Sequence, residues 1–130
     1  MSIELSEFFK DTTKNSPISQ NLASDLLKTL PSNYVEFLQF SNGIEGTVSN
    51  GSYLQMWKAE DLNDINAGYQ VKENVPGMYL VGSDGGDEAI GIDLRKDSTT
   101  YGFFFRVPFI PLTWKEAIKL GPKITDIKIV

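Results

Sequence analysis

The sequence predicts a single α+β domain, residues 1–130, in which N-terminal helices pack on a mixed or antiparallel sheet formed mainly after residue 43. Three observations lead to this prediction. The length of 130 residues suits one domain. Apolar residues recur at helical spacing before Gly43, whereas short alternating runs and a hairpin signal follow it. Helices grouped before strands are typical of α+β proteins rather than of an alternating parallel sheet.

Two helices are predicted before Gly43, after a short amphipathic pattern at the N-terminus. The first covers about residues 19–30 and ends at Leu30-Pro31, because proline disfavours helical backbone in the residue before it. The second follows directly, capped by Ser32 or Asn33. It closes at Gly43, which suits the left-handed position after a helix. The glycine therefore marks the predicted change from helices to strands.

The segment after Gly43 begins with a predicted hairpin. Thr47–Ser49 and Tyr53–Trp57 resemble strands around the turn Asn50-Gly51, and Ala59–Tyr69 resembles a short helix. Three further strands are predicted: Met78–Gly82, Glu88–Asp93 and Thr100–Val107.

The C-terminal third contains three consecutive phenylalanines, Phe103–Phe105, which require burial on both faces of a sheet. We expect Trp57 and Trp114 to belong to the core as well. Trp114–Leu120 is predicted as a closing helix, and the alternating Ile124–Val130 as an additional edge strand.

Cysteine and histidine are both absent from the sequence. Disulfides, thiolate or imidazole metal ligands, and cysteine- or histidine-based catalysis are therefore excluded. We expect no cofactor, no metal and no hydrolysis of esters, peptides or nucleic acid. Carboxylates alone still permit cleavage of glycosidic bonds, so a small carbohydrate-active enzyme stays open as an alternative to the expected non-enzymatic role.

Charge and hydropathy restrict the partners. The net charge of −5 disfavours binding to nucleic acid, which requires clustered Lys and Arg. No apolar run approaches the ~20 residues that span a bilayer, and the first residues lack the pattern of a secretory signal. We expect a cytoplasmic protein that contacts neither nucleic acid nor membrane.

The negative charge is concentrated in the segment from Glu60 to Asp93, which contains eight acids and one base, Lys72. This segment carries −7, so the remainder of the chain is slightly basic. An acidic surface of this kind favours fast association with a basic protein.

The loop Ser83–Asp87 connects two predicted strands and contains two glycines. A phosphate-binding loop is disfavoured, because Asp84, Asp87 and Glu88 would repel phosphate. The spacing also lacks the ligand pattern of a calcium loop, and Asp87 and Glu88, as neighbours in a strand, point to opposite faces rather than forming a glycosidase pair. We expect a tight turn in which glycine supplies a positive φ.

We predict that this turn and the start of the helix over 59–69 form the partner-binding surface. The candidate residues are Asp84, Asp87, Glu88, Glu60, Asp61 and Asp64. The alternative contact surface is Phe109–Leu112, an apolar segment flanked by prolines, whose other expected role is to fill the core.

An ordered set of motifs in residues 19–120 resembles the SUKH superfamily of yeast cell-wall-synthesis regulators and bacterial toxin-immunity proteins. The motifs are Leu30-Pro31 with an aromatic and Phe-Leu up to Leu38, Ser41-Asn42-Gly43, the strand Leu54–Trp57, the helix Leu62–Asn66 with its late asparagine, Leu80–Asp87 between two strands, the strand end Asp93, the strand Tyr101–Phe105, and a terminal helix that begins with the aromatic Trp114 and runs to Ile118. The segment 106–111 is apolar where relatives are often acidic.

The resemblance implies a protein-binding module, and first of all an immunity protein that neutralises a co-encoded toxin by direct binding. The partner would then be a basic toxin domain, bound through the acidic surface. The second possibility is a regulatory scaffold similar to the fungal relatives. The oligomeric state is not predicted by any of these features.

Overall fold

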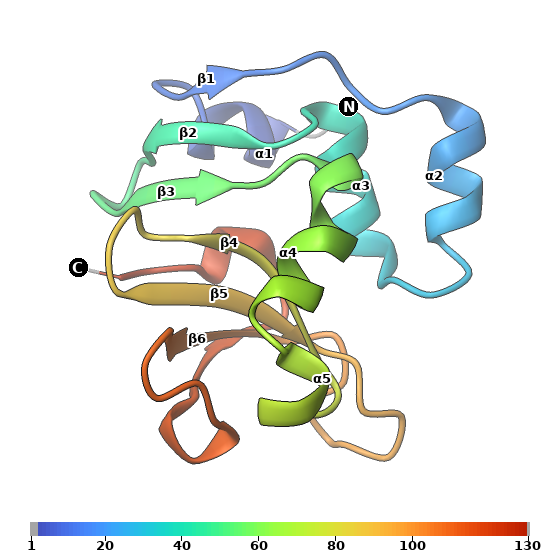
Figure 1. The fold of residues 1–130 in the computed structure, drawn as a ribbon. Coiled ribbons are helices and arrows are strands. Elements are labelled where there is room, and N and C mark those ends of the chain that lie inside the picture. The colour runs from blue at the N-terminus through green and yellow to red at the C-terminus, as the bar shows by residue number, and fades with distance from the viewer. Residues whose placement is uncertain (1–2, 130) are drawn as a thin grey trace.

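The computed structural model describes residues 3–129, which form a seven-stranded antiparallel sheet with helices on both of its faces (Figure 1). The strands cross the sheet in chain order, so each strand pairs with the next. Their bounds are β1 (Thr13–Lys14), β2 (Ile44–Thr47), β3 (Tyr53–Met56), β4 (Met78–Ser83), β5 (Glu88–Asp93), β6 (Phe104–Pro108) and β7 (Ile118–Gly121). The sheet lies mainly after residue 43, which confirms the predicted α+β class.

Three helices precede the main part of the sheet: α1 (Ile3–Phe8), α2 (Gln20–Leu26) and α3 (Ser32–Phe40). Ser19 caps α2, because its hydroxyl accepts the backbone N–H of Leu22 at 3.1 Å. α3 begins directly after Pro31, whose extended backbone separates the two helices. The predicted pair of helices before and after Pro31 is therefore confirmed. α2 ends at Leu26, four residues before the predicted end, and Pro31 rather than Ser32 or Asn33 occupies the N-cap of α3, with no side-chain cap.

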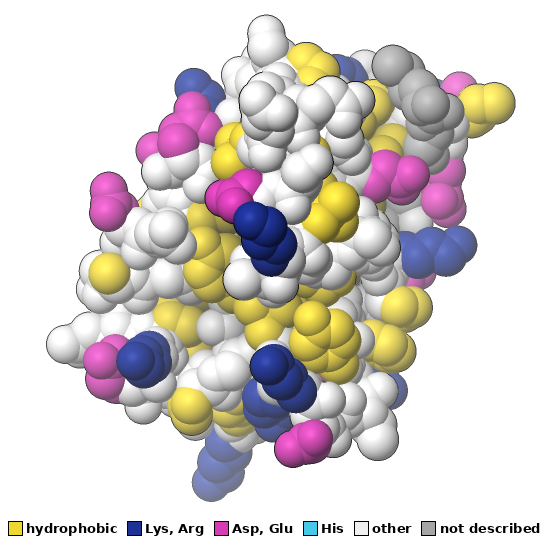
Figure 2. Space-filling view, turned by 90° about the vertical axis from the view of Figure 1, so that its right-hand side faces the viewer, with side chains coloured by type: hydrophobic (Ala, Val, Ile, Leu, Met, Phe, Trp, Pro, Cys, Tyr) yellow, Lys and Arg dark blue, Asp and Glu magenta, His cyan; other side chains and the backbone are white. Residues whose placement is uncertain are grey.

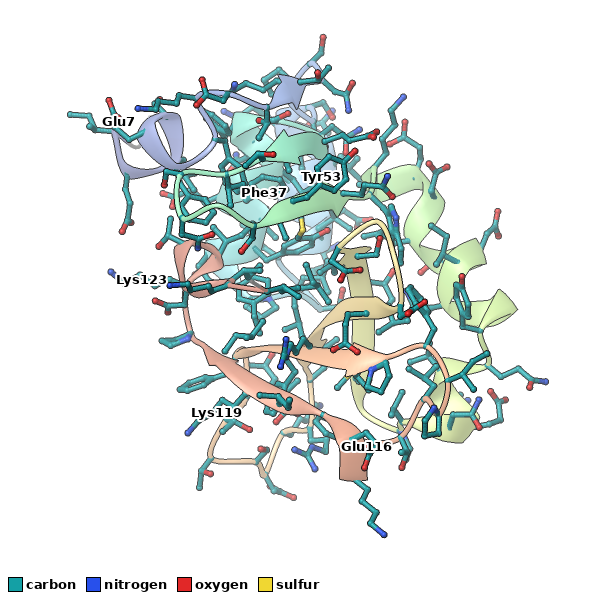
Figure 3. The ribbon with its side chains drawn as sticks, turned by 90° about the vertical axis from the view of Figure 1, so that its left-hand side faces the viewer. Glu7, Phe37, Tyr53, Glu116, Lys119 and Lys123 are labelled. Atoms are coloured by element: carbon teal, nitrogen blue, oxygen red, sulfur yellow. The ribbon has the colours of Figure 1, made fainter. Side chains whose placement is uncertain are left out.

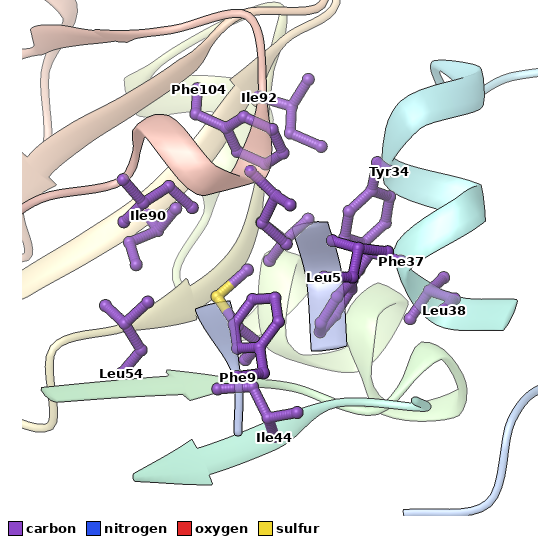
Figure 4. Close-up of a cluster of buried hydrophobic side chains, with 14 of the residues drawn as sticks. Leu5, Phe9, Tyr34, Phe37, Leu38, Ile44, Leu54, Ile90, Ile92 and Phe104 are labelled. Atoms are coloured by element: carbon purple, nitrogen blue, oxygen red, sulfur yellow. The ribbon is translucent and has the colours of Figure 1, made fainter. Parts of the chain in front are cut away.

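The main core lies between these helices and the sheet (Figure 4). Its large, fully buried side chains include Phe9, Tyr34, Phe37, Leu38, Leu54, Leu62, Ile90, Ile92, Phe104 and Ile127. The rings of Phe9 and Phe37 lie with their centroids 5.2 Å apart, so the chain just after α1 is packed directly against α3.

A second, smaller hydrophobic cluster lies on the opposite face of the sheet. The turn η1 (Ala59–Asp61) leads into α4 (Leu62–Gly68) and α5 (Val71–Asn74), which lie in front of the sheet in Figure 1. Val71 and Val75 pack in this cluster with strand residues Met78, Leu80, Phe105 and Val107. This helical layer leaves the outer side of β2 and β3 exposed, at Glu45, Thr47 and Tyr53.

The phenylalanine run is buried on both faces, as predicted. Phe104 belongs to the main core and Phe105 to the second cluster, because successive residues of β6 point to opposite sides. Phe103 is partly buried beside the second cluster.

Two C-terminal predictions were wrong. Trp114–Leu120 is not a helix: a short turn η2 (Trp114–Glu116) leads into β7, where Ile118 pairs with Arg106 of β6. Ile124–Val130 is not an edge strand, because η3 (Ile124–Asp126) folds back under the sheet and buries Ile127, while Val130 lies outside the described residues. In both places tertiary packing overrides a short local pattern.

Asn66, the late asparagine of α4, ties this helix to the sheet. Its side-chain amide donates to the carbonyls of Leu62 (2.8 Å) and Leu80 (2.9 Å), and its side-chain oxygen accepts the N–H of Leu80 (2.8 Å). All of these partners are backbone groups, so the residue acts as a structural clamp.

Asp93, at the end of β5, organises the loop that leads to β6. Its carboxylate is fully buried and accepts hydrogen bonds from the side chains of Arg95 (3.0 Å), Ser98 (2.7 Å) and Thr100 (2.6 Å). Burial alone would raise the pKa of Asp93, but these hydrogen bonds outweigh burial and hold the pKa well below its ordinary value. The Arg95 guanidinium also lies 3.7 Å from the ring centroid of Trp114, which fixes the loop to η2.

Candidate protein-binding surface

The turn between β4 and β5, residues 84–87, is called the acidic turn below. The Asp84 carboxylate accepts the backbone N–H of Gly86 (2.8 Å) and of Glu88 (3.2 Å), so this residue builds the turn. Gly85 has a φ of +82°, which confirms the predicted use of glycine at a left-handed position. Asp87 is exposed at the tip, so it is the acid of the turn with the freest access to a partner.

Glu88 begins β5 and is half-buried. Burial raises its pKa, the nearby Arg106 lowers it, and the carboxylates of Asp84 and Asp87 raise it further. The Arg106 Nε lies 3.9 Å from the Glu88 carboxylate. Glu88 is therefore partly neutralised within the fold, and the charge available to a partner comes mainly from the other two acids.

The apolar segment predicted as an alternative contact surface lies directly beside the acidic turn. The Phe109 N–H donates to the Asp87 carbonyl at 2.9 Å, and Glu88 stands opposite Pro108 in the sheet. The Phe109 ring packs on Tyr69 with centroids 4.8 Å apart, at the end of α4. The next residue, Ile110, has 91% of its surface exposed. Phe109 and Ile110 are called the apolar tip below.

The two surfaces that the sequence presented as alternatives are therefore neighbours. An exposed branched side chain next to carboxylates has the composition of an interface centre with a charged rim. The structure joins them through the register of β5 and β6, which sequence reasoning had not established.

The same surface continues from the acidic turn to the exposed side of β2 and β3. Gly85 packs against the Tyr53 ring: a side-chain carbon at this glycine would lie 2.9 Å from a ring atom. The Tyr53 hydroxyl donates to the Glu45 carboxylate, which also accepts from the Gln55 amide at 3.3 Å. The hydrogen bond to Glu45 raises the pKa of Tyr53, with the Gln55 amide acting in the opposite direction.

A cavity of about 390 Å³ opens beside this tyrosine, between β1–β3 and η1. The polar, charged and aromatic residues that line it include Thr13, Glu45, Gln55, Trp57, Lys58 and Asp61. Glu45, Tyr53 and Gln55 were not among the site residues predicted from the sequence. In β3, the alternation of Tyr53 and Gln55 with the buried Leu54 and Met56 is the signal that could have identified an exposed strand face.

The three helix acids lie apart from the acidic turn, since α4 and this turn lie at opposite ends of the strands in Figure 1. Glu60 accepts the Asn42 amide at 2.8 Å, and this hydrogen bond lowers its pKa. Asp61 lines the cavity together with Glu45, the residue that accepts the Tyr53 hydroxyl. Asp64 is exposed one turn further along α4. The structure thus divides the six predicted acids into two groups: Asp84, Asp87 and Glu88 lie on or beside the acidic turn, and Glu60, Asp61 and Asp64 lie on η1 and α4.

Basic side chains gather at the other side of the sheet. Lys115, Lys119 and Lys123 lie on or beside β7, the last strand in the sheet order. Figure 3 shows Lys119 and Lys123 well away from Tyr53. The Lys123 ammonium lies 3.7 Å from the Glu4 carboxylate, so part of this positive charge is paired within the fold.

A separate hollow lies between α2 and α4, where Figure 2 shows hydrophobic side chains gathered between the two helices. A cavity of about 400 Å³ in this place has Leu26, Leu30, Leu62, Tyr79 and Leu94 in its lining. It shares no described lining residue with the cavity beside Tyr53.

Within residues 3–129, no group of three or more acidic side chains is placed to hold a metal ion. No helix in the same part of the chain is long and apolar enough to cross a bilayer. No protein-family model and no curated protein matches the sequence. The resemblance to the SUKH superfamily therefore rests on the ordered motifs given above.

Proposed function

We propose that this protein is a protein-binding module that acts as an immunity protein and neutralises a basic toxin domain by covering its active site. The proposal combines the SUKH-like order of motifs with one structural observation. The acidic turn and the apolar tip form a single surface, linked by the hydrogen bond between Phe109 and Asp87. We propose a non-enzymatic role because the sequence contains neither histidine nor cysteine and the surface consists of carboxylates and apolar groups.

The two parts of this surface have different tasks. Asp87 and Asp84 attract a basic partner over distances of about 10 Å, which raises the association rate at low salt. Ile110 then supplies the apolar contact that slows dissociation, since full burial of such a side chain is worth about 1.5–3 kcal/mol.

Co-expression tests the proposal. The partner is the product of the reading frame adjacent to the gene, and we expect that this product arrests growth alone and is neutralised by the present chain. Ile110→Ser should weaken binding roughly 10- to 150-fold, as expected for the lost burial. Ile3→Ser is the matched control, because Ile3 is 82% exposed on α1, away from the surface.

The electrostatic part is tested by the double variant Asp84→Asn with Asp87→Lys, which changes the charge by +3 while the asparagine retains an oxygen for the turn. A control with the same charge change is Glu36→Gln with Glu116→Lys, both exposed and on other elements. Slower association at low salt in the first variant only is the expected result. Equal rates for both variants would refute the role of the acidic turn, and a harmless neighbouring product would refute the immunity role.

A regulatory scaffold is the second candidate function. The hollow between α2 and α4 favours it, because a scaffold must contact more than one partner and this hollow, lined by both apolar and polar side chains, is separate from the acidic turn. A stable complex with a non-toxic partner that is unaffected by Ile110→Ser would support the scaffold instead.

A further inference from the structure

We infer that the cavity between β1–β3 and η1 is a binding site for an arginine side chain. If the proposed function holds, this arginine belongs to the basic partner; the site itself is defined by the cavity alone. The ligand class follows from the lining, which combines two carboxylates, Glu45 and Asp61, with the indole of Trp57 and the amide of Gln55.

The volume of about 390 Å³ is large enough for one long side chain. A guanidinium group is planar, donates up to five hydrogen bonds, stacks on aromatic rings and binds carboxylates in pairs. A cavity lined by an indole and carboxylates therefore suits the guanidinium of arginine better than the compact ammonium group of lysine.

The Glu45 carboxylate is already held in place at the cavity wall. It accepts hydrogen bonds from the Tyr53 hydroxyl and the Gln55 amide, so its orientation is set before a ligand arrives. Asp61 comes from a different element, the end of η1, and faces the same cavity. Lys58 also lines the cavity and opposes a cation, so removal of its charge should strengthen binding.

The site adjoins the surface of the proposed function. Tyr53 bonds to Glu45 on one side and packs against Gly85 of the acidic turn on the other. A partner seated on the turn can therefore place an arginine in the cavity without a rearrangement of the sheet.

The test is a titration of the full chain, labelled with ¹⁵N, with acetyl-arginine amide as the probe. The chain contains two tryptophans. We expect the indole N–H signal of Trp57 to shift in a saturable manner with a millimolar Kd. The signal of Trp114 should stay in place, because Trp114 is not among the described residues that line the cavity and its indole N–H is bonded to the Pro76 carbonyl at 2.7 Å. Acetyl-citrulline amide, which has the same shape without the charge, should bind at least ten-fold more weakly.

Two variants form a matched pair. Asp61→Asn should lower the affinity for the arginine probe several-fold, whereas Asp64→Asn, in the adjoining turn of α4, should leave this affinity unchanged. Lys58→Gln should raise the affinity for the arginine probe several-fold. Equal shifts with citrulline, no saturation with arginine, or equal effects of the two asparagine variants would each overturn the inference. Because the probe requires no partner, a positive titration with failed growth rescue would reject the proposed function and retain the site.

Discussion

Removal of the buried carboxylate of Asp93 should destabilise the fold strongly. In Asp93→Asn, the remaining amide oxygen can still accept from the Arg95 N–H, and the hydroxyls of Ser98 and Thr100 can turn to accept from the new amide. The guanidinium of Arg95 donates one hydrogen bond to each carboxylate oxygen. In the variant the bond from Nε to the remaining oxygen loses its charge assistance, and the bond from Nη2 is lost and replaced by two facing donors. Such a bond contributes about 1.5–3 kcal/mol, and the 43% exposure of the Arg95 side chain places the cost toward the lower half of that range.

We therefore expect the free energy of unfolding to fall by about 2 kcal/mol, with a decrease in Tm of roughly 6–10 °C. Urea unfolding followed by tryptophan fluorescence measures the change, and the stacked Trp114 reports on the loop itself. Asp97→Asn is the control, because Asp97 is an exposed acid in the same loop. If both variants lose equal stability, the buried network is not the cause.

The pH dependence gives an independent check. The pKa of Asp93 is lower in the folded chain than its ordinary value of 3.8, so the folded state favours the ionised carboxylate. The resulting stability is complete above the unfolded pKa and is lost as the pH falls toward the folded pKa. The stability difference between the wild type and Asp93→Asn should be constant above about pH 5 and should shrink below about pH 4. A difference that grows at low pH would refute the assignment.

Two further substitutions test the packing. Tyr34→Phe should leave the free energy of unfolding unchanged or raise it by up to about 1 kcal/mol. The reason is that the Tyr34 hydroxyl is fully buried and has no hydrogen-bond partner among residues 3–129. A clear loss of stability in thermal unfolding would contradict this prediction. Asn66→Ala should cost about 2–3 kcal/mol in urea unfolding, since three backbone bonds to Leu62 and Leu80 are lost, whereas the exposed Asn63→Ala should cost less than about 1 kcal/mol.

The first half of the fold follows from signals that lie close together in the sequence. Pro31 ends one helix and permits the next. That next helix ends at Phe40 with Ser41 as its extended C-cap, and Gly43, with a φ of +86°, forms the turn into β2 rather than the helix end predicted for it. β7 could not be predicted in this way, because a seven-residue run such as Trp114–Leu120 fits helical and strand spacing equally well. Its conformation is decided by pairing with Arg106 of the preceding strand, which lies outside the run itself.

In the candidate site, too, some features follow from the local sequence and others depend on tertiary packing. The position and shape of the acidic turn could be read from its glycines and aspartates. Its contact with Phe109 depends on the register of two strands, and the cavity beside Glu45 depends on how η1 approaches β3. Neither contact has a local signature in the sequence, so the role of residues such as Tyr53 and Ile110 can be recognised only in the folded sheet.

The order of the strands has a consequence for how this protein can change. Since each strand pairs with its sequence neighbour, the acidic turn is a hairpin connection and the apolar tip begins the connection from β6 to β7. Substitutions in such connections leave the registers of the buried strands untouched. The chain can therefore acquire a new partner by altering two exposed links, while the buried side chains beneath them keep the same neighbours.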